Sequence, residues 1–164
     1  MRNEKVKKMT VCALFTAFTC LFTMIAIPVT GIGYLNAGDS IVILSAWFLG
    51  PLYGAFSAAF GSMLSDIFLG YGIYAPATFI IKGIMAIVFA ILYKILSKKN
   101  KVVAFVVSAV VAEIIMVFGY FIHAFLILGE GWGATATIYA NSFQGIFGII
   151  ASSVLASVLR KIKK

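Results

Sequence analysis

Six ionisable or amide side chains interrupt the long apolar stretches of this 164-residue sequence. They are Asp66, Lys82, Glu113, His123, Asn141 and Gln144, and a further acid, Asp39, stands at the edge of one such stretch. A charge at the centre of a bilayer costs about 2.5–3.5 kcal/mol, so such residues usually face the interior of a helix bundle. Their carboxylate, ammonium and amide groups suit the binding of a polar solute.

Motifs for catalysis or metal binding are missing from the sequence. There is no GxxxxGK[ST] phosphate-binding loop and no HExxH zinc motif. The single His123 has no evident metal partner, and Cys12 and Cys20 lie too far apart along one apolar stretch to form a disulfide. We expect no enzymatic activity, no metal and no cofactor.

The three charged side chains inside the stretches allow two interpretations. Asp66 and Lys82 flank a short loop, so they can lie at similar depth, either as a structural ion pair or with at least one of them facing a ligand. Glu113 shares a helix face with Tyr120 by its spacing. It could pair with Lys82, contact a polar solute or carry a proton, and Asp39 could bind ligand or cap a helix.

The polar and aromatic residues near the chain's loops also allow more than one role. Asn141 and Gln144, three positions apart, share a face and suit either interhelical hydrogen bonds or a heteroaromatic ligand. We interpret His123 as a hydrogen-bonded interfacial residue. An aromatic belt explains the loop residues, some of which could also stack on a planar solute: Tyr34, Tyr71, Tyr74 and Trp132.

The elements that must position these side chains are membrane helices. The chain is 63% hydrophobic and 11% charged, with a mean hydropathy of +1.10, so lipid must be its solvent. A spanning helix needs roughly 20 apolar residues. We predict a single domain over 1–164 with six helices, at about Met9–Ile27, Ile41–Leu49, Leu52–Leu69, Pro76–Leu96, Val102–Leu128 and Ala134–Leu159.

The basic residues predict the orientation. All of them except Lys82 fall in three clusters, at the N-terminus, at 94–101 and at the C-terminus, whereas the loops at 28–40, 70–75 and 129–133 contain none. By the positive-inside rule both termini are cytoplasmic. The same flanking pattern, typical of membrane proteins, argues that the net charge of +8 does not serve nucleic acid.

One predicted helix is too short to cross the bilayer. Ile41–Leu49 would rise only about 14 Å, against a hydrocarbon core of about 30 Å. Either this helix extends back through Asn36–Ser40, or the loop before it dips into the protein. Irregular backbone survives at that depth only where protein or a cavity surrounds it. The segment Pro28–Asp39 is therefore a candidate wall or lid of an outer pocket.

Small residues form two strips. Ala13 and Ala17 are four positions apart in the first helix, and Gly54, Ala58 and Ser62 form another strip in the third. Such strips let helices approach closely, either within the protein or with a partner.

With this topology the chain resembles the S components of energy-coupling-factor (ECF) vitamin transporters. The likeness rests on Tyr34-Leu-Asn-Ala-Gly-Asp39, Leu49-Gly-Pro-Leu-Tyr-Gly-Ala55 and Tyr74-Ala-Pro-Ala-Thr-Phe-Ile-Ile-Lys-Gly83. It implies a subunit in the prokaryotic plasma membrane that captures one vitamin near the outer face. It also implies a membrane scaffold, the T component, and two cytoplasmic ATPases as partners, with toppling in the membrane to release the vitamin. The family's AxxxA docking motif falls on Ala13 and Ala17.

The same resemblance suggests the ligand. A vitamin B6 compound, pyridoxine or pyridoxamine, is the first expectation; hydroxymethylpyrimidine, riboflavin and pantothenate are alternatives. The expected ligand-binding residues are Asn36, Asp39, Asp66, Tyr74, Lys82, Glu113, Tyr120, Asn141 and Gln144. Two other functions stay open: a self-sufficient proton-coupled carrier that uses Glu113, and a membrane enzyme or assembly factor without a transport role.

Overall fold

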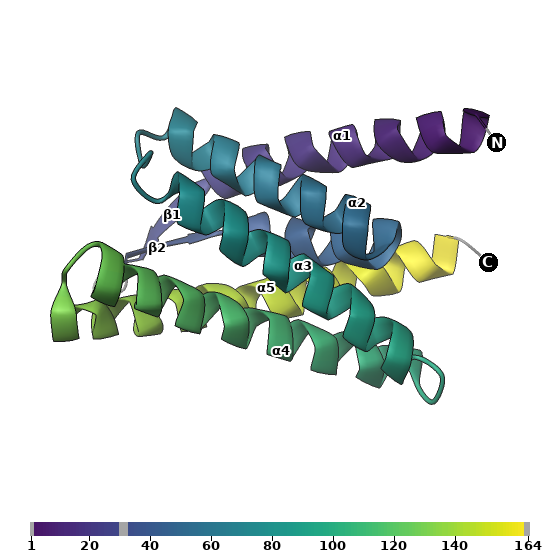
Figure 1. Cartoon of the computed structure of the whole chain (residues 1–164). Helices are drawn as coiled ribbons and strands as arrows, with labels where there is room; N and C mark the ends of the chain where they lie inside the picture. Colours follow the sequence, from purple (N-terminus) through teal and green to yellow (C-terminus); the bar gives the residue numbers. More distant parts are fainter. Residues whose placement is uncertain (1, 30–32, 163–164) are drawn as a thin grey trace.

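The computed structural model describes residues 2–29 and 33–162, and it is an all-helical bundle with one small β-hairpin. Figure 1 shows the helices packed roughly side by side along one direction. The long helices are α1 (Arg2–Met24), α2 (Gly38–Phe68), α3 (Ala75–Leu96), α4 (Lys101–Ile122) and α5 (Thr135–Ile162). In the described residues, five helical segments are long and apolar enough to span a membrane.

The predicted count of six separate helices is not reproduced, because α2 is one element with a kink. Gly50 in its interior has φ 78 and ψ −172, a conformation that favours glycine, and Pro51 follows it. The chain folds back here: the Ser45 hydroxyl donates to the Gly54 carbonyl at 3.3 Å. A side chain at Gly54 would lie 2.6 Å from Ala46 Cα. The two arms of α2 match the predicted 41–49 and 52–69 segments.

The first arm of α2 forms the centre of the bundle. Every residue from Gly38 to Ala46 is buried. A helix that is apolar around its whole circumference belongs inside a protein, and α2 as a whole contacts α1, α3 and α5. This position resolves the length problem, since protein rather than lipid surrounds the short arm. The arm also extends back to Gly38, one of the two outcomes expected.

The segment before α2 is a hairpin, not the predicted loop. Strands β1 (Ala26–Val29) and β2 (Gly33–Asn36) pair antiparallel, with Ala26 opposite Asn36 and Val29 opposite Gly33. The intervening residues 30–32 lie outside the described part of the chain. Proline is tolerated at the edge of a sheet, so Pro28 ends the helical stretch without preventing the strand. Helix α1 therefore ends at Met24, before the predicted Ile27, and begins earlier, at Arg2.

A second irregular segment separates α4 from α5. A π-helical turn, η1 (His123–Ile127), continues α4, and a 3-10 turn, η2 (Gly131–Ala134), precedes α5. The prediction had a straight helix to Leu128 followed by a loop. This end of the bundle also carries the hairpin and the connection between α2 and α3 (Figure 1).

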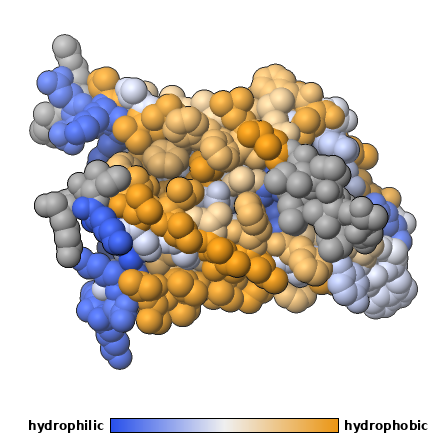
Figure 2. Space-filling model, turned by 180° about the vertical axis from the view of Figure 1, so that it is seen from behind, coloured by the Kyte–Doolittle hydropathy of each residue, from blue (hydrophilic) through white to orange (hydrophobic). Residues whose placement is uncertain are grey.

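The start of α1, the end of α5 and the turn between α3 and α4 lie together at the opposite end (Figure 1). Figure 2 shows hydrophilic residues gathered there beside a broad hydrophobic surface. The described side chains of this basic end include Lys5, Lys8, Lys94, Lys99 and Lys161, all exposed. The side chains of Arg2, Lys163 and Lys164 lie outside the described residues. The three basic clusters of the sequence thus share one end.

Candidate ligand cavity

A cavity of about 210 Å³ opens at the end opposite the basic clusters. Helices α1, α2, α3, α4 and α5 and the end of β2 all contribute to its wall. Seven of the nine predicted ligand-binding residues line it: Asn36, Asp66, Tyr74, Lys82, Tyr120, Asn141 and Gln144. Tyr71, one of the loop aromatics that could stack on a planar solute, also lines it; the sequence prediction missed the rest of its wall, which is Thr23, Ser62, Leu69, Thr78, Thr137 and Ala140.

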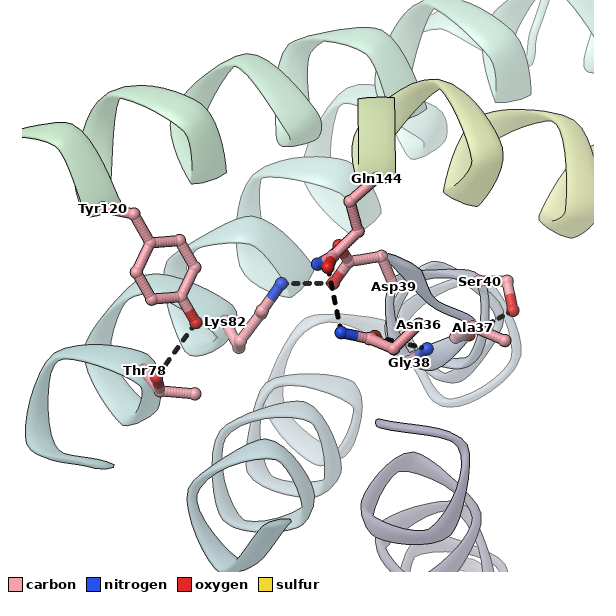
Figure 3. Close-up of polar contacts among 9 residues, drawn as sticks. All are labelled: Asn36, Ala37, Gly38, Asp39, Ser40, Thr78, Lys82, Tyr120 and Gln144. Atoms are coloured by element: carbon pink, nitrogen blue, oxygen red, sulfur yellow. Dashed lines mark hydrogen bonds and ion pairs between the residues drawn. The ribbon is translucent and has the colours of Figure 1, made fainter. Parts of the chain in front are cut away.

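The other two predicted residues, Asp39 and Glu113, are buried behind this wall. Asp39, in the first turn of α2, is 1% exposed and pairs with the ammonium of Lys82 from α3 (Figure 3). The sequence left open an ion pair of Lys82 with Asp66 or with Glu113; among the described residues Lys82 instead pairs with Asp39. Asp39 is not a helix cap either, because the N-cap position is Ala37 and no side chain caps it.

The ion pair is the centre of a buried hydrogen-bond chain (Figure 3). Gln144 Nε2 donates to the second carboxylate oxygen of Asp39 at 2.7 Å. Asn36 Nδ2 in turn donates to Gln144 Oε1 at 2.9 Å, and the Gly38 amide donates to Asn36 Oδ1 at 2.9 Å. This chain ties the hairpin to α5 and, through Asp39, to α3. Each of its polar groups has a partner, as buried polar groups require.

Two hydroxyl groups form a second contact on the wall. Thr78 Oγ1 and the Tyr120 hydroxyl lie 2.9 Å apart. The Tyr120 ring centroid is 5.5 Å from Lys82 Nζ, within the range of a cation–π interaction. The ammonium of Lys82 is thus held by a carboxylate and an aromatic face before any ligand arrives.

Asp66 is the acid that faces the cavity without being neutralised in this way. Its carboxylate lines the cavity, and its Oδ2 atom has no hydrogen-bond partner among the described residues. Among all the described residues, the only ion pair is the one between Lys82 and Asp39. The cavity therefore offers an acceptor that a ligand with N–H or O–H groups can satisfy.

Glu113 has a different surrounding. It is 4% exposed, and neither carboxylate oxygen has a hydrogen-bond partner among the described residues. It lies against α5, where a side chain at Gly148 would meet Glu113 Oε1 at 2.8 Å and Asp39 Cβ at 3.0 Å. Glycine at this position makes room for both acids.

The mouth of the cavity carries aromatic side chains. The Tyr74 ring lies 6.5 Å from that of Tyr71 and 5.4 Å from that of His123, measured between centroids. His123 is buried, and the hydrogen bond that we expected for its side chain is not found at Nδ1, which has no partner among the described residues. The side chain of Tyr34 lies outside the described residues. Trp132 is exposed and contacts Phe125.

The two small-residue strips have different surroundings. Gly54, Ala58 and Ser62 are buried, as internal packing requires. Ala13 and Ala17 are exposed on α1, where they contribute little to the core of this chain.

Comparisons with known proteins agree with this architecture. A family model described as ECF-type riboflavin transporter, S component, matches residues 3–161. The chain is 34% identical to an uncharacterized protein of Pyrococcus woesei, over 87% of this chain and 93% of the relative. It is 29% identical to the thiamine precursor transporter HmpT of Lactococcus lactis, over 98% of this chain and 92% of the relative. A solved S component of a bacterial ECF transporter has the same fold, with a TM-score of 0.81 at 20% identity, covering 98% of this chain and 99% of that one.

Proposed function

Because the chain belongs to the family of S components of ECF-type transporters, we propose that its cavity captures a small vitamin precursor, with hydroxymethylpyrimidine as the first candidate. Membership makes it a multi-pass membrane protein and a substrate-binding subunit. The observation that carries the choice of ligand is the polar cavity in which Lys82 is already paired and Asp66 is not.

This charge arrangement favours a ligand with hydrogen-bond donors. An amino group attached to the ring presents N–H donors to a carboxylate such as Asp66, and a hydrogen bond to a charged group is worth about 1.5–3 kcal/mol. The hydroxyls of Thr78 and Tyr120 and the amide of Asn141 suit a hydroxymethyl group. An anionic ligand would have to displace Asp39 from Lys82 and would be repelled by Asp66.

The size of the cavity supports a single ring. Its 210 Å³ lies below the range of about 300–1,000 Å³ that is typical for drug-sized ligands. Riboflavin, with three fused rings and a sugar-alcohol chain, fits this volume less well. Pantothenate carries a carboxylate. Pyridoxine and pyridoxamine also have a single aromatic ring, a pyridine, with a hydroxymethyl group, and they are the second candidates. The relative named as a thiamine precursor transporter favours the pyrimidine.

Orientation and partners complete the proposal. The positive-inside rule places the basic end in the cytoplasm, so the cavity opens to the outside. Without a phosphate-binding loop the chain cannot hydrolyse ATP, and release depends on a membrane scaffold and two ATPases. Ala13 and Ala17, exposed on α1, are the proposed docking residues.

Calorimetric titration of the purified protein tests the ligand. We expect hydroxymethylpyrimidine to bind most tightly, pyridoxine or pyridoxamine more weakly, and riboflavin and pantothenate not measurably. Asp66→Asn is expected to weaken binding at least about tenfold, equivalent to 1.4 kcal/mol. Glu4→Gln, which removes an exposed carboxylate at the basic end, is the matched control. Unchanged binding in Asp66→Asn, or binding of none of these compounds, would contradict the proposal.

A further inference from the structure

The single histidine of the chain lies against a residue of the cavity mouth. His123 is 8% exposed, and its ring centroid lies 5.4 Å from that of Tyr74, at an angle of 54° between the two rings. Tyr74 lines the cavity, whereas His123 does not. The imidazole therefore supports a wall residue from behind and does not itself face the ligand.

An unusual stretch of backbone places the imidazole there. His123 is the first residue of the π-helical turn η1, and its carbonyl accepts from the Leu128 amide at 3.1 Å, across the five-residue spacing of a π-helix. Such single turns are rare and occur frequently at functional sites. The chain reverses at Gly129, whose φ is 72°, and the Glu130 amide then donates to the Ala124 carbonyl at 3.1 Å. Glu130 is thereby brought back beside the start of η1.

The imidazole can gain a charge that this arrangement does not accommodate. Histidine is the side chain whose charge ordinarily changes between about pH 5 and pH 8. A protonated ring carries an N–H donor on each nitrogen, yet Nδ1 of His123 has no partner among the described residues. The face of the Tyr74 ring can attract a cation but cannot accept both of these hydrogen bonds. The contact with Tyr74 therefore suits the neutral imidazole.

Glu130 is the acid beside this histidine. Its negative charge acts on both the His123 ring and the Tyr74 phenol. The other titratable groups on this side are two phenols: Tyr71, whose ring lies 6.5 Å from that of Tyr74, and Tyr120, one turn before His123 on α4. Glu130 is exposed, so an ion pair with it takes the imidazole toward solvent and away from Tyr74.

We propose that His123 is a positioning residue that makes the mouth of the cavity sensitive to pH. As a neutral ring it holds Tyr74 in the cavity wall. Once protonated it pairs with Glu130 and leaves Tyr74 without support, so the ligand leaves faster in acid. The effect on the ligand rests on the proposed function, whereas the movement of the imidazole can be measured without a ligand.

Nuclear magnetic resonance of the purified protein in detergent tests this movement, because one histidine gives one set of imidazole signals. At about pH 8 we expect nuclear Overhauser contacts between the rings of His123 and Tyr74, and at about pH 5 a protonated imidazole that has lost them. The rings of Trp47 and Phe105, 6.0 Å apart near the basic end, are the internal control and should keep their contacts throughout.

Three results of this measurement would overturn the inference. The imidazole could stay neutral over the whole range, or it could be protonated and keep its contacts with Tyr74. Simultaneous loss of the contacts between Trp47 and Phe105 would show that acid loosens the whole bundle and not the cavity mouth.

Stopped-flow dissociation of hydroxymethylpyrimidine tests the effect on the ligand. In the wild type we expect dissociation to be about tenfold faster at the lower pH, equivalent to about 1.4 kcal/mol. His123→Phe keeps a ring against Tyr74 but cannot be protonated, so it should dissociate at the slow rate at both pH values. His123→Ala removes the ring and should dissociate at the fast rate at both. Glu130→Gln removes the acid that pairs with the imidazolium, so it should reduce the acceleration.

The comparison with His123→Phe also isolates this histidine from other groups that take up protons in acid. A proton on the ligand or on Asp66 would accelerate dissociation equally in the wild type and in His123→Phe. Equal acceleration would therefore overturn the inference and leave the ligand site in place. Absence of hydroxymethylpyrimidine binding at both pH values would instead contradict the proposed function, and the ring contacts of His123 would then decide the inference alone.

Discussion

Lys82 and Asp39, 43 positions apart in the sequence, form a buried ion pair that joins α3 to the first turn of α2. The pair leaves Lys82 at 4% and Asp39 at 1% exposure. It neutralises the charge of Lys82, so the Asp66 carboxylate is the acid of the cavity wall left to meet a ligand. The polarity of the cavity is thus decided by a residue that does not line it.

Breaking this pair from one side should destabilise the protein more than removing it altogether. Asp39→Asn leaves a buried ammonium without its counter-charge, at a cost of about 3–5 kcal/mol. The double variant Asp39→Leu with Lys82→Met removes both charges, and we expect it to recover most of that loss. Denaturant unfolding in detergent measures the difference. A double variant as unstable as Asp39→Asn would show that the pair is not the stabilising unit.

The contact between Asn36 and Gln144 should slow the escape of the ligand, because it ties the hairpin to α5 at the cavity. Asn36→Ala leaves Gln144 Oε1 without its donor and the Gly38 amide without its acceptor, at about 1–3 kcal/mol. We expect ligand dissociation to accelerate by about five- to a hundredfold, as measured by stopped-flow fluorescence.

Asn100→Ala is the control for this variant. Asn100 caps α4 at the basic end by accepting from the amides of Val102 and Val103. Its loss should lower stability by about 1 kcal/mol and leave the dissociation rate unchanged. Similar rates in both variants would mean that the hairpin does not retain the ligand.

Replacing Glu113 distinguishes two transport mechanisms: import by an ATPase-driven complex, and proton-coupled transport by this chain alone. Its carboxyl does not line the cavity, so Glu113→Gln should keep ligand affinity unchanged in a titration. In vesicles containing only this chain we expect no uptake driven by a proton gradient, with Glu130→Gln as the matched acid variant. Gradient-driven uptake that disappears in Glu113→Gln would establish the proton-coupled carrier instead.

Bulky side chains at Ala13 or Ala17 should uncouple binding from uptake. Both residues are exposed on α1, so tryptophan there would not disturb the core of this chain. We expect Ala13→Trp and Ala17→Trp to bind the ligand normally while cellular uptake falls to background. Val110→Trp, at a 39% exposed position on α4, is the control. Normal uptake in both alanine variants would place the docking surface elsewhere.

The phenol of Tyr74 should make the free energy of unfolding depend on pH in the alkaline range. Burial, together with Glu130 and Tyr71, raises the pKa of the Tyr74 phenol above its ordinary 10.0. The folded state therefore holds this proton more tightly than the unfolded state. The protonated phenol makes its whole contribution to the free energy of unfolding below pH 10, and this contribution is lost as the pH rises further. Tyr74→Phe should lose less unfolding free energy than the wild type between about pH 9 and pH 11.

The control for this titration is Tyr139→Phe, which alters a tyrosine that is 69% exposed. Its unfolding free energy should follow the wild-type pH dependence. A Tyr74→Phe variant that does the same would show that burial at the cavity mouth does not hold the proton.

Local pattern was enough to predict the helical stretches and the break at Gly50-Pro51, because hydropathy and turn residues act over a few positions. It also selected seven residues of the cavity wall, because a polar side chain inside an apolar stretch usually faces the bundle interior or a water-filled cavity. The side of the membrane that each end faces stays a prediction.

The partner of Lys82 could not be predicted in this way. Asp66 is near it in sequence across one short connection, whereas Asp39 reaches it only because the first arm of α2 occupies the centre of the bundle. The hairpin was missed because glycines and Pro28 are equally typical of loops. Threonines such as Thr23, Thr78 and Thr137 gave no signal, because hydroxyl residues are common throughout membrane helices.

The first arm of α2 connects the ligand cavity to the basic end of the bundle. It begins at the ion pair beside the cavity and ends at the Gly50 kink near the basic end, about 18 Å away for its 12 residues. Its residues from Gly38 to Ala46 are buried among the other helices, whereas Phe48 near its far tip is 51% exposed. We therefore expect a ligand that shifts Asp39 to move the far tip of this arm, at the basic end, as well.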